Sequence, residues 1–257
     1  MKYDKLQKNH YDKVARKFKL SKFSTMADEF IRDAETKFIL HNIKKNFFLL
    51  DIGCGNGFTL RTIYKKNKTC KLYGLENNLS LHNLARKSLG KKAKIIKHDI
   101  RKKLNNFKNF FDIIICQRVL INLMKINDQR KALSNILYLL KRNGKLIIIE
   151  GFQSGLDNLN FLRKKLKLSK ISVAYHNLNL KDDFFKKKNL KDITPKNTKN
   201  LLSKNYFISR VLDPIYNLAF HKKKFKYRSD FTRTLSKIIP NLDLNIGQLK
   251  FLVFKKI

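Results

Sequence analysis

The sequence predicts an α/β protein built around a doubly wound parallel sheet. Short apolar stretches alternate with longer stretches that carry one apolar face, and this alternation runs from residue 45 to residue 150. Alternation of this kind is typical of parallel sheets whose crossover connections are helices. The stretch 111–116 is rich in isoleucine, as expected for a strand that is buried on both faces. A glycine-rich turn joins the first apolar stretch to a helix and marks the start of the alternation.

The elements up to residue 150 are expected from local signals. Thr25-Met26-Ala27-Asp28 has the form of a capping box and predicts the first core helix, whose apolar face extends to Phe38. A later helix is expected to be capped by Asp128 and to end in the basic turn 141–144, where Gly144 would close it. The expected strands are 47–52, 71–76, 94–97, 111–116 and 145–150, and the helices between them are 58–66, 79–89 and 128–140.

The regular alternation is lost beyond residue 150. The apolar run 206–212, stopped by Asp213-Pro214, predicts a sixth strand, and the run 249–254 predicts a seventh. Residues 151–204 then form an insertion above the carboxyl ends of the strands, where ligands bind in open α/β sheets. Helices in this half are expected at 155–168, at 197–203 and within 215–239, with Pro240 ending the last one.

The residues after the first strand read Asp51-Ile52-Gly53-Cys54-Gly55-Asn56-Gly57. Glycine allows a positive φ and a close approach of a ligand to the backbone, and the next helix offers free N–H groups. A dinucleotide site has the spacing G-x-G-x-x-G, but here the third glycine comes one residue early and Phe58 takes its place. With Asp51 two residues before the first glycine, the pattern Asp-x-Gly-x-Gly-x-Gly resembles the first motif of class I S-adenosylmethionine-dependent methyltransferases.

Further positions extend this resemblance over residues 10–150. Glu76 ends the second strand about twenty residues after the glycines, the separation expected for a carboxylate that binds a ribose. His98-Asp99-Ile100 follows the third strand, Phe111-Asp112 opens the fourth, and Leu-Lys-x-x-Gly-Lys occupies 140–145. The resemblance implies S-adenosylmethionine as cofactor and a Rossmann-like, doubly wound seven-stranded sheet whose last strand is antiparallel. It also implies an N-terminal helical lid and a mostly helical insertion between strands five and six.

The resemblance assigns contacts to the cofactor as well. The turn would hold its amino-acid end, Asp99 and Ile100 would lie around the adenine, and Gln117 and Arg118 would line the methionine end. Asp99 is alternatively a cap of the next turn. Arg32 is either a cofactor ligand or the solvated partner of Glu35 or Thr36. The residues expected to contact the cofactor are Asp51, Gly53, Cys54, Gly55, Gly57, Glu76, Asn77, Asp99, Ile100, Gln117, Arg32 and Tyr11.

Methyl transfer to a hydroxyl needs an acceptor in line with the methyl group and benefits from a base within hydrogen-bond reach. His176, between Tyr175 and Asn177 in the insertion, is the expected base because an imidazole titrates near physiological pH. A structural histidine of the insertion is the alternative. Arg118 either binds an anionic group of the substrate or pairs with Glu150 at the neighbouring strand end. The candidate catalytic residues are therefore His176, Glu150 and Arg118.

The net charge of +39 reflects 58 basic residues, 46 of them lysine, against 19 acidic ones. Such an excess is typical of proteins that bind nucleic acid. The lysines are spread along the chain beside many Asn, Ile and Phe residues, all with A/T-rich codons, so genome composition is the competing source. Three cysteines without metal-ligand spacing predict reduced thiols and no metal site. Neither a signal peptide nor a membrane span is expected, which predicts a cytoplasmic protein.

The sequence thus predicts a single methyltransferase domain. Its parts are a lid and first helix (1–44), a cofactor-binding core (45–150), a substrate cap (151–204) and the last two strands (205–257). The stretch 118–123, together with Gly155-Leu156-Asp157 and His176-Asn177, resembles a bacterial small-molecule or glycan methyltransferase subgroup. The expected acceptor is accordingly a small hydroxylated molecule such as a sugar or glycan precursor. The alternatives are an RNA methyltransferase that uses the basic surface and a non-catalytic module that binds the cofactor or nucleic acid.

Overall fold

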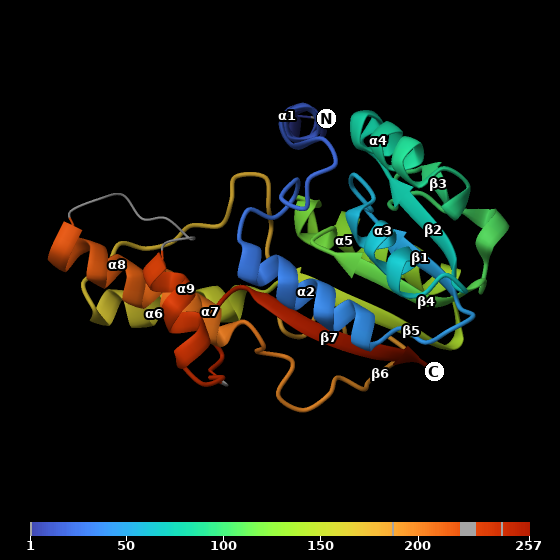
Figure 1. Ribbon diagram of the computed structural model, residues 1–257. Coiled ribbons are helices and arrows are strands. Elements are labelled where there is room, and N and C mark those ends of the chain that lie inside the picture. Colours follow the sequence, from blue (N-terminus) through green and yellow to red (C-terminus); the bar gives the residue numbers. More distant parts are fainter. Residues whose placement is uncertain (1, 187, 222–229, 243) are drawn as a thin grey trace.

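A seven-stranded mixed sheet forms the centre of the protein (Figure 1). The computed structural model describes residues 2–186, 188–221, 230–242 and 244–257. The strand order is β3-β2-β1-β4-β5-β7-β6. Strands β1 to β5 are parallel to one another, and β7 is antiparallel to β5. The strands are β1 (Phe48–Ile52), β2 (Lys71–Glu76), β3 (Ala93–Lys97), β4 (Phe111–Gln117), β5 (Leu140–Gly151), β6 (Leu190–Asp192) and β7 (Leu249–Lys256).

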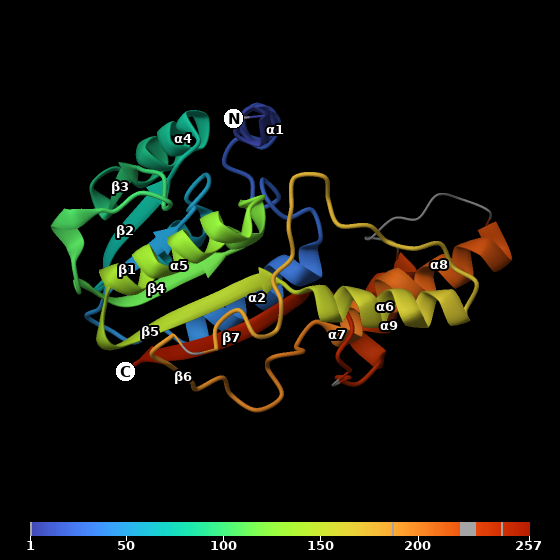
Figure 2. The same cartoon turned by 180° about the vertical axis from the view of Figure 1, so that it is seen from behind.

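Helices cover both faces of this sheet. Helices α2 and α3 lie on the face seen in Figure 1 and α5 lies on the opposite face, seen in Figure 2. Both views show α6, α7, α8 and α9 gathered beside the sheet, and α1 apart from the layers. The helices are α1 (Lys2–Phe18), α2 (Glu29–His41), α3 (Phe58–Lys66), α4 (Leu79–Leu89), α5 (Ile126–Leu139), α6 (Gln153–Lys165), α7 (Ser203–Phe207), α8 (Asp213–Tyr216) and α9 (Asp230–Ile238).

The central strands carry apolar side chains on both faces because each face packs against a helical layer. In β5, Ile147 lies in the apolar cluster that includes Phe38 of α2. The next residue, Ile148, lies in the second cluster, which includes Ile136 of α5. Both isoleucines are fully buried. Because successive side chains of a strand point to opposite faces, an unbroken apolar run is what this position requires.

The predicted parallel core and the antiparallel last strand are confirmed. Strands β1 to β4 lie within one residue of the predicted bounds, and β7 begins at the predicted Leu249. Strand β5 begins five residues earlier than predicted, so Gly144 lies inside the strand and does not close the preceding helix. That helix, α5, begins at Ile126, and Asp128 lies in its first turn instead of capping it.

The capping box predicted to begin at Thr25 is wrong, because the N-cap lies three residues later, at Asp28. Helix α2 begins at Glu29, and its N-cap is Asp28, whose carboxylate accepts a hydrogen bond from the backbone N–H of Ile31 at 3.2 Å. A side chain at the N-cap satisfies one of the free N–H groups of the first turn, and here Asp28 takes that role. Thr25 lies before the helix, where its side chain lines the cavity at the carboxyl ends of the strands.

The predicted sixth strand, 206–212, is helical. This run spans the end of α7 and a π-helical turn η4 (Ile208–Leu212). Helix α8 follows directly, with Pro214 in its first turn. A short apolar run does not distinguish a buried helix from a buried strand, and proline is favoured in the first turn of a helix. The sixth strand is instead the short β6, which pairs with β7 at the edge of the sheet.

Other boundaries in this half also differ from the prediction. Helix α6 spans 153–165, not 155–168, and the predicted helix 197–203 is a series of turns that precedes α7. Within 215–239 the chain forms a π-helical turn η5 (Asn217–His221) and α9, and the basic residues 222–229 lie outside the described residues. No helix among the described residues is long and apolar enough to cross a membrane.

The two-sided burial of β5 predicts how its core responds to truncation. Ile148→Ala removes buried side-chain atoms and leaves a cavity against α5, so the free energy of unfolding should fall by about 2–5 kcal/mol, whereas Ile148→Val should cost about 0.5–1.5 kcal/mol. Urea denaturation measures both values. The control is Ile257→Ala, because this side chain is 64% exposed and its removal should leave the stability nearly unchanged. An Ile148→Ala variant as stable as the control would contradict this packing.

Candidate active site

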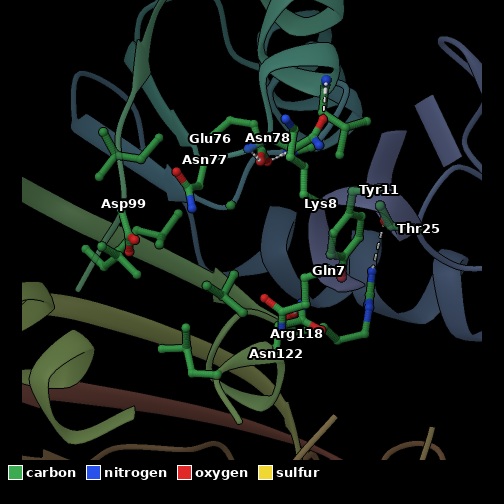
Figure 3. A pocket seen from close by; sticks show the side chains of 18 of the residues that line it. Gln7, Lys8, Tyr11, Thr25, Glu76, Asn77, Asn78, Asp99, Arg118 and Asn122 are labelled. Carbon is green, nitrogen blue, oxygen red and sulfur yellow. Dashed lines mark hydrogen bonds between the residues drawn. The ribbon is translucent and has the colours of Figure 1, made fainter. Parts of the chain in front are cut away.

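A cavity of about 590 Å³ opens at the carboxyl ends of β1, β2, β3 and β4 (Figure 3). Four loops that follow these strands line it, together with α1 and the segment that carries His176 and Asn177. It therefore lies at the edge of the sheet where ligands bind in open α/β folds. The polar residues that line it include Gln7, Lys8, Tyr11, Thr25, Glu76, Asn77, Asn78, Asp99, Gln117, Arg118 and Asn122.

The glycine turn between β1 and α3 needs glycine for two different reasons. Gly53, Gly55 and Gly57 all have positive φ values, of 63°, 56° and 78°. A Cβ at Gly53 would lie 2.6 Å from a methyl group of Val119, and one at Gly57 would lie 2.8 Å from Leu89 of α4. The early third glycine is thus explained by its left-handed N-cap position on α3 and by the close approach of α4.

Glu76 at the end of β2 ties this turn to the next one. Its buried carboxylate accepts the backbone N–H of Gly55 at 2.8 Å and that of Asn78 at 2.7 Å (Figure 3). Burial raises the pKa of Glu76 above its ordinary value, against the two backbone donors. Asp51 lies behind the turn, where burial and then the Glu76 charge raise its pKa to about 8, while Arg32 acts in the opposite direction.

At the far end of the cavity, Asp99 and Ile100 follow β3, as predicted. The Asp99 carboxylate accepts hydrogen bonds from the guanidinium of Arg101, the shortest 2.7 Å long, and from the Arg101 backbone N–H at 2.9 Å. Asp99 therefore lines the cavity and also caps its own turn, the alternative left open by the sequence. Asn77 lies beside it and accepts a hydrogen bond from Lys97 at 3.2 Å.

Helix α1 is held to the rim of the cavity by contacts along its length. Near its start, Asp4 pairs with Arg101 at 2.9 Å. In its middle, Asp12 accepts hydrogen bonds from Asn78 and Ser80 at the start of α4, each at 2.8 Å. Tyr11, which lies between these contacts, lines the cavity, and burial raises its pKa. This placement agrees with the lid predicted from the N-terminal residues.

Two arginines share one carboxylate beside Gly53. The Nη1 of Arg32 lies 3.4 Å from Glu35, and Arg118 forms an ion pair with the same buried carboxylate. Both guanidiniums also donate to Thr25, at 2.9 and 3.4 Å. Burial lowers the pKa of Arg32 to about 10 and that of Arg118 to about 9. The predicted pair of Arg32 with Glu35 is therefore formed, but it is buried and not solvated, since Arg32 is 3% exposed. The two guanidiniums outnumber the Glu35 carboxylate, which leaves an excess of positive charge beside the cavity.

The pairing of Arg118 with Glu150 predicted from the sequence is not formed. Glu150 is fully buried and does not line the cavity. Its carboxylate accepts the backbone N–H groups of Val119, Leu120 and Ile121, at 2.7, 2.9 and 3.3 Å. Burial raises its pKa to about 7 in spite of these donors.

His176 reaches the cavity from the segment between α6 and β6. Its ring stacks on that of His10 in α1, with centroids 4.2 Å apart, and the Nδ1 of His10 lies 3.1 Å from the hydroxyl of Tyr175. Burial, and secondarily His10, lowers the pKa of His176 to about 4, so the expected titration near physiological pH is wrong. The Nδ1 of His176 and the Oδ1 of Asn177 are buried and have no hydrogen-bond partner among the described residues.

Several residues of the site were not predicted from the sequence. Asp12 and Arg101, which hold α1, lie on the surface of their elements and carry no local motif. Glu35 was considered only as a partner of Arg32. Asn122 comes from the turn after β4, and its position in the cavity depends on the carboxylate of Glu150 behind that turn.

Comparison with known proteins agrees with this geometry. A family model described as "Methyltransferase domain" matches residues 43–205, more than half of the chain. A solved complex of the Haloferax volcanii Trm112 methyltransferase activator with a methyltransferase matches with a TM-score of 0.55 and 12% identity, over 91% of this chain and 95% of the other. A Galdieria sulphuraria protein assigned as a sarcosine dimethylglycine methyltransferase matches with a TM-score of 0.52 and 15% identity, over 91% and 86% of the two chains.

The MccD protein matches with a TM-score of 0.50 and 18% identity, over 87% of this chain and 96% of that one. At such identities these structures show similarity of fold alone. A search of curated proteins finds no match. The family match, on a sheet and glycine turn of the geometry described above, shows that this chain belongs to the methyltransferase domain family and uses S-adenosylmethionine as its cofactor.

Proposed function

We propose that this methyltransferase methylates a hydroxyl group of a small acceptor, such as a sugar or glycan precursor. The observation that carries the proposal is the pair of unpartnered atoms at the cavity, Nδ1 of His176 and Oδ1 of Asn177. A buried polar atom without a partner is costly, so these two atoms are arranged for a ligand. A neutral imidazole nitrogen and an amide oxygen both accept hydrogen bonds, which suits an acceptor with two hydroxyl groups.

The cofactor-binding residues have a donor set that fits S-adenosylmethionine. The Glu76 carboxylate has about four lone-pair sites, and the backbone N–H groups of Gly55, Asn77 and Asn78 do not fill them all, so it can still accept a hydroxyl of a ribose. The surplus positive charge of Arg32 and Arg118 over Glu35 suits the carboxylate of the methionine end. In this assignment the cofactor contacts the backbone of the turn, at Gly53, Cys54, Gly55 and Gly57, and Asp51 supports this turn from behind. Asn77 lies at the ribose, and Asp99 and Ile100 lie at the adenine. Gln117 lies at the methionine end, and Tyr11 lies over the cofactor.

The bound cofactor supplies an electrophilic methyl group on a sulfonium sulfur. The chain's own contribution is to place the acceptor oxygen in line with that methyl carbon and to receive its proton. On methyl transfer, Nδ1 of His176 would receive the proton of the acceptor hydroxyl. The low pKa of His176 keeps the imidazole neutral at physiological pH, so one ring nitrogen is free to accept a hydrogen bond.

The charges around the cavity favour a neutral acceptor. Among the described residues that line it, the acidic ones are Asp4, Glu76 and Asp99, which come from the start of α1 and from the ends of β2 and β3. The basic residues that line it are Lys8, Lys97, Arg101 and Arg118. The amine of a substrate such as sarcosine, named for the Galdieria protein, would add a positive charge to a cavity in which basic residues outnumber acidic ones. A hydroxyl carries no charge and avoids this repulsion.

RNA is a second candidate acceptor because of the net charge of +39. The position of α1 weighs against it, since Asp4, Asp12 and His10 hold this helix to the rim and leave room for a small molecule. Incubation with labelled S-adenosylmethionine and fractionated cell extract separates the two. Label in small molecules or glycans supports the proposal, label in RNA supports the alternative, and binding without transfer to any fraction identifies a non-catalytic module.

The Glu76 assignment predicts a specific loss of cofactor affinity. Glu76→Gln keeps the side-chain shape but replaces one accepting oxygen by a donor that faces a backbone N–H. Loss of hydrogen bonds to a charged acceptor costs about 1.5–3 kcal/mol, so affinity for S-adenosylmethionine should fall about 10- to 100-fold by calorimetry. Glu29→Gln is the matched control, because Glu29 pairs with Lys22 away from the cavity. Equal affinity of Glu76→Gln and wild type would refute the assigned ribose site.

The proposed base predicts a separation of binding from transfer. His176→Phe keeps a ring that can stack on His10 but removes the accepting nitrogen, so labelled methyl transfer should fall about 10²- to 10⁴-fold. Affinity for S-adenosylmethionine should remain within about twofold of wild type. His41→Phe, on the exposed end of α2, is the control. Undiminished transfer by His176→Phe would reduce His176 to a structural role.

The stacked histidines also predict an acid-dependent stability. Burial lowers the pKa of both His10 and His176 in the folded protein, so the unfolded chain binds more protons below its ordinary pKa of about 6.5. Above that pH both rings are neutral in the folded and the unfolded protein. Below it, proton uptake favours the unfolded chain, so the melting temperature should fall as the pH drops from 6.5 toward 4. A His10→Phe and His176→Phe double variant should show a shallower decline. Parallel pH profiles for the two proteins would contradict this linkage.

A further inference from the structure

The turn after β4 is wound around a single buried carboxylate. Glu150, at the end of β5, accepts three successive backbone N–H groups of this turn, from Val119 to Ile121. Immediately before them, Arg118 has a φ of 54°, a left-handed conformation that costs energy for a residue with a side chain, and its backbone N–H bonds to Ile149 at 2.8 Å. The carboxylate is therefore the group around which this turn closes.

The turn supplies one wall of the cavity. Arg118, Val119, Ile121, Asn122 and Leu123 all line it. The amide of Asn122 donates back to the carbonyl of Arg118 at 2.6 Å, which closes the turn on itself. Because three N–H groups bond to one carboxylate, a change at Glu150 moves this wall as a unit.

Gln129 joins this wall to the segment that carries His176 and Asn177. It lies in α5, is 2% exposed, and its amide nitrogen donates to the carbonyls of Leu120 at 3.1 Å and Leu178 at 2.9 Å. The backbone N–H of Leu178 in turn donates to the carbonyl of Ile121 at 2.7 Å. One side chain thus bonds both to the wall and to the residue that directly follows Asn177.

The segment depends on such contacts because it has little regular structure of its own. Between Leu166 and Asn189 the described residues form no helix or extended strand, and one isolated bridge joins Leu180 to Phe152. Leu178, which directly follows Asn177, is the residue through which this segment bonds to Gln129 and to Ile121. Neither Glu150 nor Gln129 lines the cavity, so neither touches the acceptor directly.

We propose that Glu150 and Gln129 are positioning residues that together set the acceptor-binding end of the cavity. Glu150 fixes the turn 118–122, and Gln129 fixes the distance between this turn and the His176–Asn177 pair. The role of these two residues in acceptor placement rests on the proposed function. Their effect on the position of His176 does not depend on the proposed function, because it is measured without an acceptor.

The test is nuclear magnetic resonance of the protein with isotope-labelled histidine. Gln129→Met keeps the volume of the side chain but removes both donated hydrogen bonds, and Gln129→Asn retains an amide too short to reach both carbonyls. In both variants the His176 resonance should lose its ring-current shift from His10, and its pKa should rise from about 4 toward 6.5 as the ring leaves its buried site. Affinity for S-adenosylmethionine should remain within about twofold of wild type.

The matched control is Asn135→Leu on the same helix. Asn135 donates to the carbonyl of Ile100 at 2.8 Å, at the opposite end of the cavity, so its removal should leave the His176 resonance and pKa unchanged. Glu150→Gln still offers one accepting oxygen to the turn and should move the His176 resonance less than Glu150→Ala does. An unshifted His176 resonance in folded Gln129→Met and Gln129→Asn would overturn the proposal.

Transfer kinetics then distinguish this inference from the proposed function. With the acceptor fraction found in cell extract, Gln129→Met should lower kcat/KM about 10²-fold, because a displacement of about 1 Å has an effect of that size. A shifted His176 with unchanged transfer would retain the structural coupling but overturn its role in acceptor placement. If label enters RNA alone, the proposed function fails, while the His176 shift still reports whether the coupling exists.

Discussion

Buried carboxylates that bind backbone N–H groups determine the shape of this active site. Glu76 holds the turn after β1 to the turn after β2, and Glu150 closes the turn after β4. In both cases the acid stands at the carboxyl end of a strand, and the turn after the neighbouring parallel strand presents N–H groups to it. Loss of either carboxylate would leave several buried donors unsatisfied at once, so the cofactor and acceptor ends depend on the same kind of interaction.

The parallel core and the cofactor turn were predictable because their signals are local. The glycines of 53–57, the acid Glu76 and the isoleucine-rich strands each reflect a constraint that acts within a few residues. The C-terminal half was not predictable in this way. The run 206–212 is buried on an irregular pattern that fits a strand as well as a helix, and it forms the end of α7 and the π-helical turn η4.

The functional residues likewise comprise those with a local sequence signal and those without one. Positions at strand ends, such as Glu76 and Asp99, reach the cavity wherever the fold forms. Gln129 and Asp12 act through partners about 50 to 70 residues away, so the sequence around each carries no sign of its role. His176 was identified by its residue type, but its low pKa arises from burial against His10, a contact between the N-terminal helix and the insertion.

Helix α1 contacts both ends of the cavity, and this has a consequence for the order of events in turnover. Asp4 and Asp12 join it to Arg101 and Asn78, at the ends of β3 and β2, whereas His10 joins it to the side of His176. A bound donor and a bound acceptor therefore each add to the closure of one and the same helix. Because the same helix borders both ends, we expect its opening to expose the donor side and the acceptor side together. Release of both products would then share one step, which would limit the turnover rate.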